Sequence, residues 1–239
     1  MALPKLNNTP YYDVTIPSTG ENTTYRPYLV KEEKILLMAS ETADSQQIAR
    51  AMFDIVCKCV EGVNRNKLTT FDMDYLFLQL RTKAVGETAN ILATCQNSDC
   101  FEQNEVKVEI GKVKVNMPKE KNNIVILSDD MTLELKYPTY NDVLNDKIMA
   151  YAESETELMY QTVMLCLDVL NVKDERMLFA EEPVEDIVEF IGSLTTEQFS
   201  KLNKFANNIP SVEEIIKFKC KKCNKENESI LIGTNDFFQ

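Results

Sequence analysis

The spacing of apolar residues divides the 239-residue chain into four segments. Apolar residues recur three and four positions apart over residues 30–87, as they do on one side of an amphipathic helix. Residues 88–137 change to strand-like alternation, helical spacing returns over residues 138–209, and residues 210–239 contain two more strand-like stretches. The pattern predicts an α+β fold in which helical groups flank a small antiparallel β region.

Two helices of the first group have clear start signals. Asp44 is a candidate N-cap, and the stripe that follows it runs from Ile48 to Val60. Thr69 or Thr70 begins a second helix, whose segment Tyr75–Arg81 is apolar on more than one side. Such a helix is either central to the core or covered by a partner. We favour the central position.

Alternation over residues 104–137 predicts about four antiparallel strands, continuous with the hairpin formed around the first cysteine pair. In the second helical group, four helices are expected: one starting near Tyr140 and including Ile148, one spanning Glu155–Leu170, one after Pro183, and one after the capping-box sequence that begins at Thr195.

Residues 1–29 are expected to form an extended N-terminal arm, because four prolines are spread through them. Turn-forming residues between two short β-like pieces predict a hairpin within the arm. The arm carries four tyrosines that are candidates for partner binding: Tyr11, Tyr12, Tyr25 and Tyr28. Two alternatives stay open, namely strand pairing with a neighbouring subunit and folding of the hairpin onto its own domain.

Two cysteine pairs lie far apart in the sequence, each at the turn of a predicted hairpin. Cys95 and Cys100 form the first pair, and Cys220 and Cys223 form the second. Strand-like stretches lead into and out of both pairs. Two turns that each carry two thiolates can complete a tetrahedral shell around one ion. The spacing therefore predicts a split, zinc-ribbon-like site in which the four cysteines hold one structural zinc ion.

The sequence disfavours two other roles for the cysteines, namely disulfides and a redox motif. Disulfides within each pair are disfavoured because the N-terminus does not resemble a secretory signal. A redox CxxC motif starts a helix, whereas Cys223 is followed by a turn and then by a strand-like stretch. The chain has no histidine, which argues against a catalytic zinc.

If residues near 95 and near 220 bind the same ion, the chain segment between them starts and ends at one site. We therefore expect residues 30–239 to form a single interdependent α+β domain. Its parts are a helical segment (30–87), a β segment with the first cysteine pair (88–137), a second helical segment (138–209) and the second cysteine hairpin (210–239).

Charge, the lengths of the apolar runs and the absence of catalytic motifs disfavour several classes of function. A formal net charge of −12 disfavours binding to nucleic acid or to anionic membranes. No apolar run approaches the ~20 residues that span a bilayer, so we expect no membrane span and a cytoplasmic location. The sequence contains no GxxxxGK(S/T) or GxGxxG phosphate-binding loop, no GxSxG nucleophile motif and no EF-hand loop. We expect neither an enzyme nor a small-molecule substrate.

The stretch Phe71–Arg81, followed by Lys83-Ala-Val-Gly-Glu87, resembles the hub-assembly baseplate proteins of T-even-type contractile-tailed phages. The Thr195–Phe199 segment and the Cys220–Cys223 pair fit in the same order, so that the resemblance covers roughly residues 1–235. It implies a non-enzymatic protein that helps to build, or becomes part of, the tail baseplate hub. Its partners would be other baseplate, hub or tail proteins. It would act in the host cytoplasm during assembly and, if it stays in the particle, in the virion tail.

The alternative function is that of a zinc-ribbon adaptor or regulator of transcription, because zinc ribbons are common in such proteins. A basic face around the second cysteine pair would favour that function. Five lysines cluster there: Lys217, Lys219, Lys221, Lys222 and Lys225. The same lysines can equally solvate the hairpin or stabilise thiolate charge.

Overall fold

The computed structural model describes residues 9–118, 123–144 and 154–237. The chain divides into two compact units. Unit 1 consists of Met1–Asn116 together with Ser211–Gln239, and unit 2 consists of Met117–Pro210. Helices and small antiparallel sheets occur in both units, so the α+β class is confirmed. The expected single domain over residues 30–239 concerns cooperative unfolding and stays a prediction.

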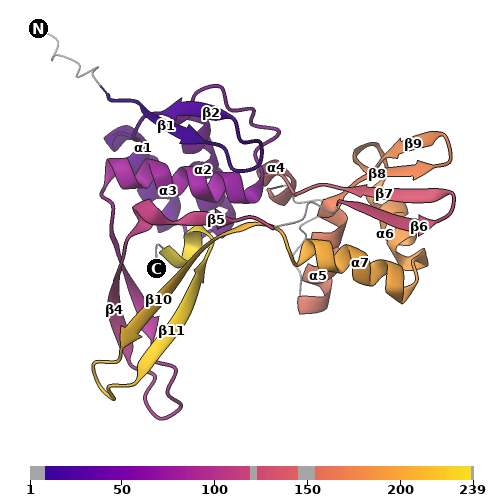
Figure 1. Cartoon of the computed structure of the whole chain (residues 1–239). Helices are drawn as coiled ribbons and strands as arrows, with labels where there is room; N and C mark the ends of the chain where they lie inside the picture. Colours follow the sequence, from indigo (N-terminus) through magenta and orange to yellow (C-terminus); the bar gives the residue numbers. More distant parts are fainter. Residues whose placement is uncertain (1–8, 119–122, 145–153, 238–239) are drawn as a thin grey trace, which may run out of the picture. The chain divides into compact units, whose positions relative to one another are not determined.

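Unit 1 contains the helices α1 (Val30–Glu41), α2 (Ser45–Cys59) and α3 (Thr70–Ala84) (Figure 1). Its strands are β1 (Tyr12–Thr15), β2 (Asn22–Tyr25), β3 (Ala89–Thr94), β4 (Gln103–Val108), β5 (Lys114–Asn116), β10 (Ser211–Lys219) and β11 (Glu226–Ile232). Short 3-10 helices occupy Ile110–Lys112 and Thr234–Phe237. The strands form the two-stranded sheets β1–β2 and β3–β4 and a three-stranded sheet in the order β11–β10–β5.

Helix α3 is the central helix of unit 1, as expected. Its apolar side chains Phe71, Met73, Leu76, Leu78 and Leu80 are each at most 1% exposed. The predicted caps are present as well. The Asp44 carboxylate accepts a hydrogen bond from the Gln46 amide at the start of α2, and Thr69 caps α3.

Two carboxylates in the first turns of α3 attach distant segments to this helix. Asp72 is fully buried and accepts a hydrogen bond of 2.8 Å from the backbone amide of Ser18, in the turn between β1 and β2. Asp74 accepts a bond of 2.9 Å from the Thr234 hydroxyl, near the C-terminus. The N-terminal hairpin and the C-terminal segment are therefore both bound to the helix that forms the centre of the unit.

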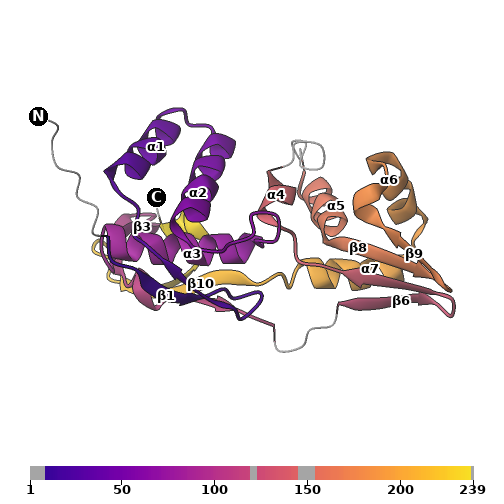
Figure 2. The same cartoon turned by 90° about the horizontal axis from the view of Figure 1, so that it is seen from above.

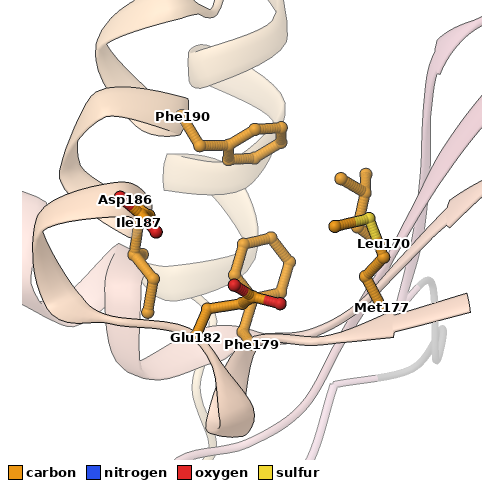
Figure 3. A pocket seen from close by; sticks show the side chains of 7 residues that line it. All are labelled: Leu170, Met177, Phe179, Glu182, Asp186, Ile187 and Phe190. Atoms are coloured by element: carbon orange, nitrogen blue, oxygen red, sulfur yellow. The ribbon is translucent and has the colours of Figure 1, made fainter.

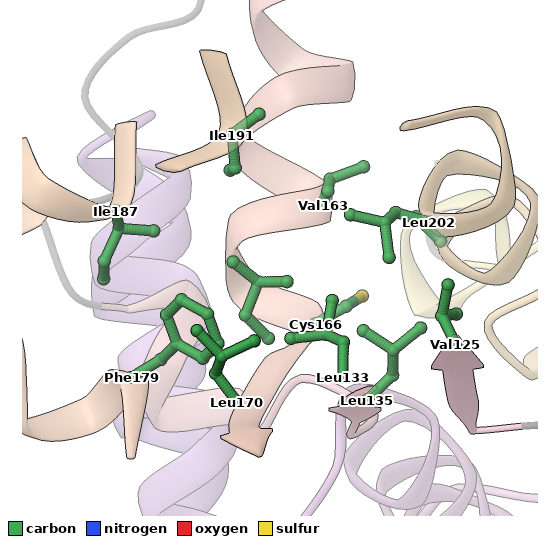
Figure 4. Close-up of a cluster of buried hydrophobic side chains, with 12 residues drawn as sticks. Val125, Leu133, Leu135, Val163, Cys166, Leu170, Phe179, Ile187, Ile191 and Leu202 are labelled. Atoms are coloured by element: carbon green, nitrogen blue, oxygen red, sulfur yellow. The ribbon is translucent and has the colours of Figure 1, made fainter. Parts of the chain in front are cut away.

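Unit 2 consists of α4 (Tyr140–Val143), α5 (Glu155–Cys166), α6 (Val184–Ser193) and α7 (Thr196–Ala206), with a 3-10 helix at Phe179–Glu181. Its four strands form one antiparallel sheet in chain order: β6 (Ile124–Ser128), β7 (Met131–Leu135), β8 (Leu167–Val172) and β9 (Glu175–Leu178). Side chains from the sheet, α5, α6 and α7 meet in one apolar cluster, which includes Leu133, Val163, Ile191 and Leu202 (Figure 4).

Three expectations about local structure need correction. The strands of residues 104–137 are not one meander, because β5 pairs with β10, whereas β6 and β7 belong to the sheet of unit 2. The helix expected over Glu155–Leu170 ends at Cys166, and its last residues form β8, where Leu170 pairs with Leu133 of β7. The helix expected from Tyr140 ends at Val143, and Ile148 lies outside the described residues.

These differences have one physical cause. A short apolar run is compatible with a helix or with a strand, and pairing with a strand distant in sequence decides between them. Strands β8 and β9 also show that the segment 138–209 is not entirely helical.

Candidate metal centre

The four predicted cysteine ligands meet at the ends of two hairpins of unit 1. Cys95 and Cys100 flank the turn between β3 and β4, whose register pairs Thr94 with Gln103. Cys220 and Cys223 occupy the turn between β10 and β11. Figure 1 shows the two hairpins extending in the same direction, with their turns close together. All four sulfur atoms lie within 4.8 Å of one another, so the structure brings the whole predicted set together.

The sulfur–sulfur distances match a tetrahedral metal site. The Sγ atoms of Cys95 and Cys223 are 3.6 Å apart, and those of Cys100 and Cys220 are 3.8 Å apart. Sulfur atoms about 2.3 Å from a central ion, at the corners of a regular tetrahedron, are separated by about 3.8 Å. A disulfide needs about 2.05 Å, and all four cysteines are free thiols. The arrangement thus has the dimensions of a shell of four thiolates around one ion.

Both cysteine turns share a backbone conformation. The residue after the second cysteine of each pair has a positive φ, 47° at Phe101 and 59° at Asn224. This left-handed conformation folds the chain back, so that the Cys95 amide donates to the Glu102 carbonyl and the Cys220 amide donates to the Lys225 carbonyl, each over 2.9 Å. Non-glycine residues adopt such a φ uncommonly. Here it occurs at the same position of both turns, which hold the four clustered sulfur atoms.

Backbone amides around the turns are aimed at the sulfur atoms. The pKa of the Cys220 thiol falls to about 6 because the amides of Cys223 and Lys222 donate to its sulfur. The Lys225 amide lowers the pKa of Cys223 in the same way. Donors of this kind favour the thiolate, which is the form that binds metal.

The other two thiols behave oppositely. Burial and the neighbouring thiols raise the pKa of Cys95. At Cys100 the Glu102 amide acts to lower the pKa, but burial and the neighbouring thiols raise it to about 11. Four thiolates this close repel one another, and a divalent cation is the charge that lets all four ionise together.

Two buried asparagines, which were not among the residues predicted from the sequence, join the hairpins. Asn104 of β4 accepts a hydrogen bond of 2.8 Å from the Lys221 amide, and its side-chain amide lies 3.7 Å from the Cys220 sulfur. Asn227 of β11 accepts one of 2.9 Å from the Gln96 amide. Each hairpin therefore supplies one asparagine to the cysteine turn of the other.

A sequence signal for these asparagines was present. Each lies four positions after the second cysteine of its pair, in Cys100-Phe-Glu-Gln-Asn104 and Cys223-Asn-Lys-Glu-Asn227. Each also falls on the inward side of its strand, with an exposed neighbour on either side in sequence. A buried amide needs hydrogen-bond partners. Each amide oxygen accepts from the backbone of the opposite turn, and each amide nitrogen donates to a carbonyl of its own turn, that of Glu102 or Lys225.

The four predicted tyrosines do not form one surface. Tyr11 is 55% exposed, Tyr12 is half-buried, and Tyr25 and Tyr28 are 3% and 9% exposed. Burial raises the pKa of Tyr25 to about 12. Tyr25 also forms a β-bridge with Val60. Of the two alternatives for the arm, the hairpin therefore folds onto its own unit, and Tyr11 is the one of the four tyrosines that is exposed.

Unit 2 has a separate apolar pocket of about 110 Å³ (Figure 3). Its walls are Leu170, Met177, Phe179, Ile187 and Phe190, with the carboxylates of Glu182 and Asp186 at its edge. Both acidic residues are exposed to solvent. The pocket has no arrangement of nucleophile and base, and it lacks the convergent polar groups of an active site.

The fold and the four-cysteine centre define a class of protein, an α+β protein whose two distant hairpins meet at a split, ribbon-like cysteine cluster. The family described as "T4 bacteriophage base plate protein" matches residues 9–239. The chain belongs to this family, and it is therefore a phage baseplate protein. No curated protein and no solved structure matches the chain. In the described part of the chain, no helix is long and apolar enough to cross a membrane.

Proposed function

We propose that this baseplate protein helps to build, or forms part of, the central hub of the tail baseplate. It acts through contacts with other baseplate, hub and tail proteins and has no catalytic role. Family membership over residues 9–239 supports the baseplate assignment, and the resemblance of the Phe71–Arg81 stretch supports the hub. The protein works in the host cytoplasm during assembly and in the tail of the particle.

The same proposal includes one structural zinc ion, bound by Cys95, Cys100, Cys220 and Cys223. The observation that carries it is the set of sulfur–sulfur distances, which have the dimensions of a tetrahedral shell of four thiolates. Four thiolates leave no open coordination position for a substrate. The role of the metal is to hold the hairpins β3–β4 and β10–β11 together.

The lysines near the second cysteine pair support a protein partner over a nucleic-acid partner. Lys217 forms an ion pair of 2.9 Å with Glu228, and Lys222 forms one of 3.4 Å with Glu102. Lys225 donates to the Gln96 carbonyl. These lysines solvate and join the hairpins, and neighbouring carboxylates offset part of their positive charge. A surface that binds phosphates needs positive charge that is not offset in this way. We propose exposed Tyr11 as the tyrosine of the arm that contacts a partner.

Zinc binding is tested by elemental analysis of protein purified without added metal, together with thiol titration. About one zinc per chain is expected. Of the three cysteines outside the cluster, Cys57 should react most readily in the native state, because Cys59 and Cys166 are buried. All seven thiols should react in denaturant with a chelator. Protein that contains no metal as purified, and whose melting temperature does not change when zinc is added, would refute the zinc site.

The hub role is tested separately, by producing the phage without this protein and examining its tails by electron microscopy and mass spectrometry. We expect tails that lack a completed baseplate hub, and rescue by the protein supplied in trans. Complete, infectious particles would refute the hub role and leave the zinc site unaffected. If the protein contains no metal and still rescues assembly, the hub role stands and the zinc site is refuted.

A further inference from the structure

Helix α1 buries a charged side chain and exposes apolar ones. The only residue that it buries is Glu32, 3% exposed, whose carboxylate is 3.1 Å from Arg26 and accepts a hydrogen bond of 2.8 Å from the Leu29 amide. Val30, Leu37 and Met38 are 79%, 61% and 57% exposed. A surface helix normally has the reverse arrangement. Val30, Leu37 and Met38 thus face away from the core of unit 1, whereas Leu36 and Ala39 are half-buried.

These exposed residues form one stripe along the helix. Val30, Lys34, Leu37, Met38 and Glu41 follow one another at short intervals that place them on one side of an α-helix. Lys34 and Glu41 lie about two turns apart, on either side of Leu37 and Met38. We call these five residues the α1 stripe. Helix α1 packs along α2 with its other side and lies at the periphery of unit 1 (Figure 2).

We propose that the α1 stripe binds the α1 stripe of a second copy of this chain, with the two helices antiparallel. A two-fold axis between Leu37 and Met38 places Leu37 of each copy opposite Met38 of the other. The same axis places Lys34 opposite Glu41 twice, so both ion pairs follow from one symmetry operation. Within the described residues, neither Lys34 nor Glu41 has an ion-pair partner in its own chain.

The charge order selects both the occupant and its direction. A parallel pair in register would place Lys34 against Lys34 and Glu41 against Glu41, which is unfavourable. The antiparallel pair has an apolar centre bounded by opposite charges at both ends, and such large exposed apolar side chains mark an interaction surface.

The size of the contact predicts its strength. Because the axis lies between Leu37 and Met38, the two 12-residue helices overlap over residues 34–41, a length of about 12 Å. Contacts of this extent bury less than the ~1,200 Å² typical of stable complexes. The dimer should therefore be weak and its population should depend on concentration. This inference depends on neither the zinc site nor the hub role.

The test is sedimentation velocity of the purified full-length protein from micromolar to sub-millimolar concentration. The wild type should shift reversibly from monomer to dimer. Leu37→Glu should raise the dimer dissociation constant at least about tenfold, since it places charge at the apolar centre. The matched control is Val188→Glu in α6, where an apolar side chain is 54% exposed. It should leave the dissociation constant unchanged.

Charge exchange supplies the decisive comparison. Lys34→Glu and Glu41→Lys should each weaken the dimer about tenfold, because each turns two attractive pairs into two repulsive ones. The double variant should restore wild-type association. Both side chains are exposed, so unchanged thermal melting will show that the variants fold. A wild type that stays monomeric throughout, or a double variant as weak as the single ones, would overturn the proposal.

Discussion

Replacing Cys220 with serine tests how far the metal centre stabilises unit 1. A serine hydroxyl is a poor zinc ligand, and the Cys220 sulfur is the acceptor for hydrogen bonds from the Cys223 and Lys222 amides and from Asn104. Structural zinc sites contribute about 10–16 kcal/mol in zinc-finger peptides at neutral pH. Shared equally among four thiolates, this energy assigns about 2.5–4 kcal/mol to one ligand.

That loss is large beside the total stability of a domain, about 5–15 kcal/mol. For a unit of roughly 145 residues, each kcal/mol lowers the melting temperature by about 3–4 °C. Cys220→Ser should therefore lower the melting temperature by about 8–16 °C, with zinc bound more weakly by the three remaining thiolates. The matched control is Cys57→Ser, which changes a half-buried thiol of α2 outside the cluster and should retain both zinc and stability.

Differential scanning calorimetry and elemental analysis measure the two effects on the same samples. A melting temperature within about 2 °C of the wild type, or zinc bound as tightly as in the wild type, would refute the reasoning. The same curves test whether residues 30–239 unfold as one domain. A single transition that shifts as a whole supports one cooperative domain, whereas a shift confined to part of the transition assigns independent stability to unit 2.

Three further predictions concern unit 1. Burial raises the pKa of Asp74 to about 6, despite hydrogen bonds from Thr234. The folded state therefore holds this proton more tightly than the unfolded state, and the free energy of unfolding should fall by about 1–3 kcal/mol as the pH rises from about 4 to about 6. Thermal melts of Asp74→Asn should not show this fall. Asn104→Ala should weaken zinc binding about 10–100-fold in chelator competition, and an unchanged affinity would contradict its positioning role. Deleting residues 1–25 removes buried Val14 and Tyr25 and should lower the denaturation midpoint, so an unchanged midpoint would argue against a packed hairpin.

The cysteine centre shows how much of a site could be predicted from sequence. The spacing within each pair and the strand-like flanks were sufficient to identify all four cysteines that the structure brings together, because turn and ligand spacing are local properties. The supporting asparagines were missed, since their role depends on which backbone groups of the other hairpin they meet. Their common offset from Cys100 and Cys223 becomes informative only once the two turns are seen as counterparts.

The sequence by itself determined the elements whose signals lie within a few residues. The caps at Asp44 and Thr69, the apolar surface of α3 and the two cysteine hairpins all follow from local spacing and backbone chemistry. The tertiary structure alone decided the elements that need a distant partner. Residues Leu167–Val172 became a strand because β7 pairs with them, and Tyr25 became a core side chain because the arm packs against its own unit. Local rules cannot identify a partner tens of residues away, whereas pairing and burial depend on that partner.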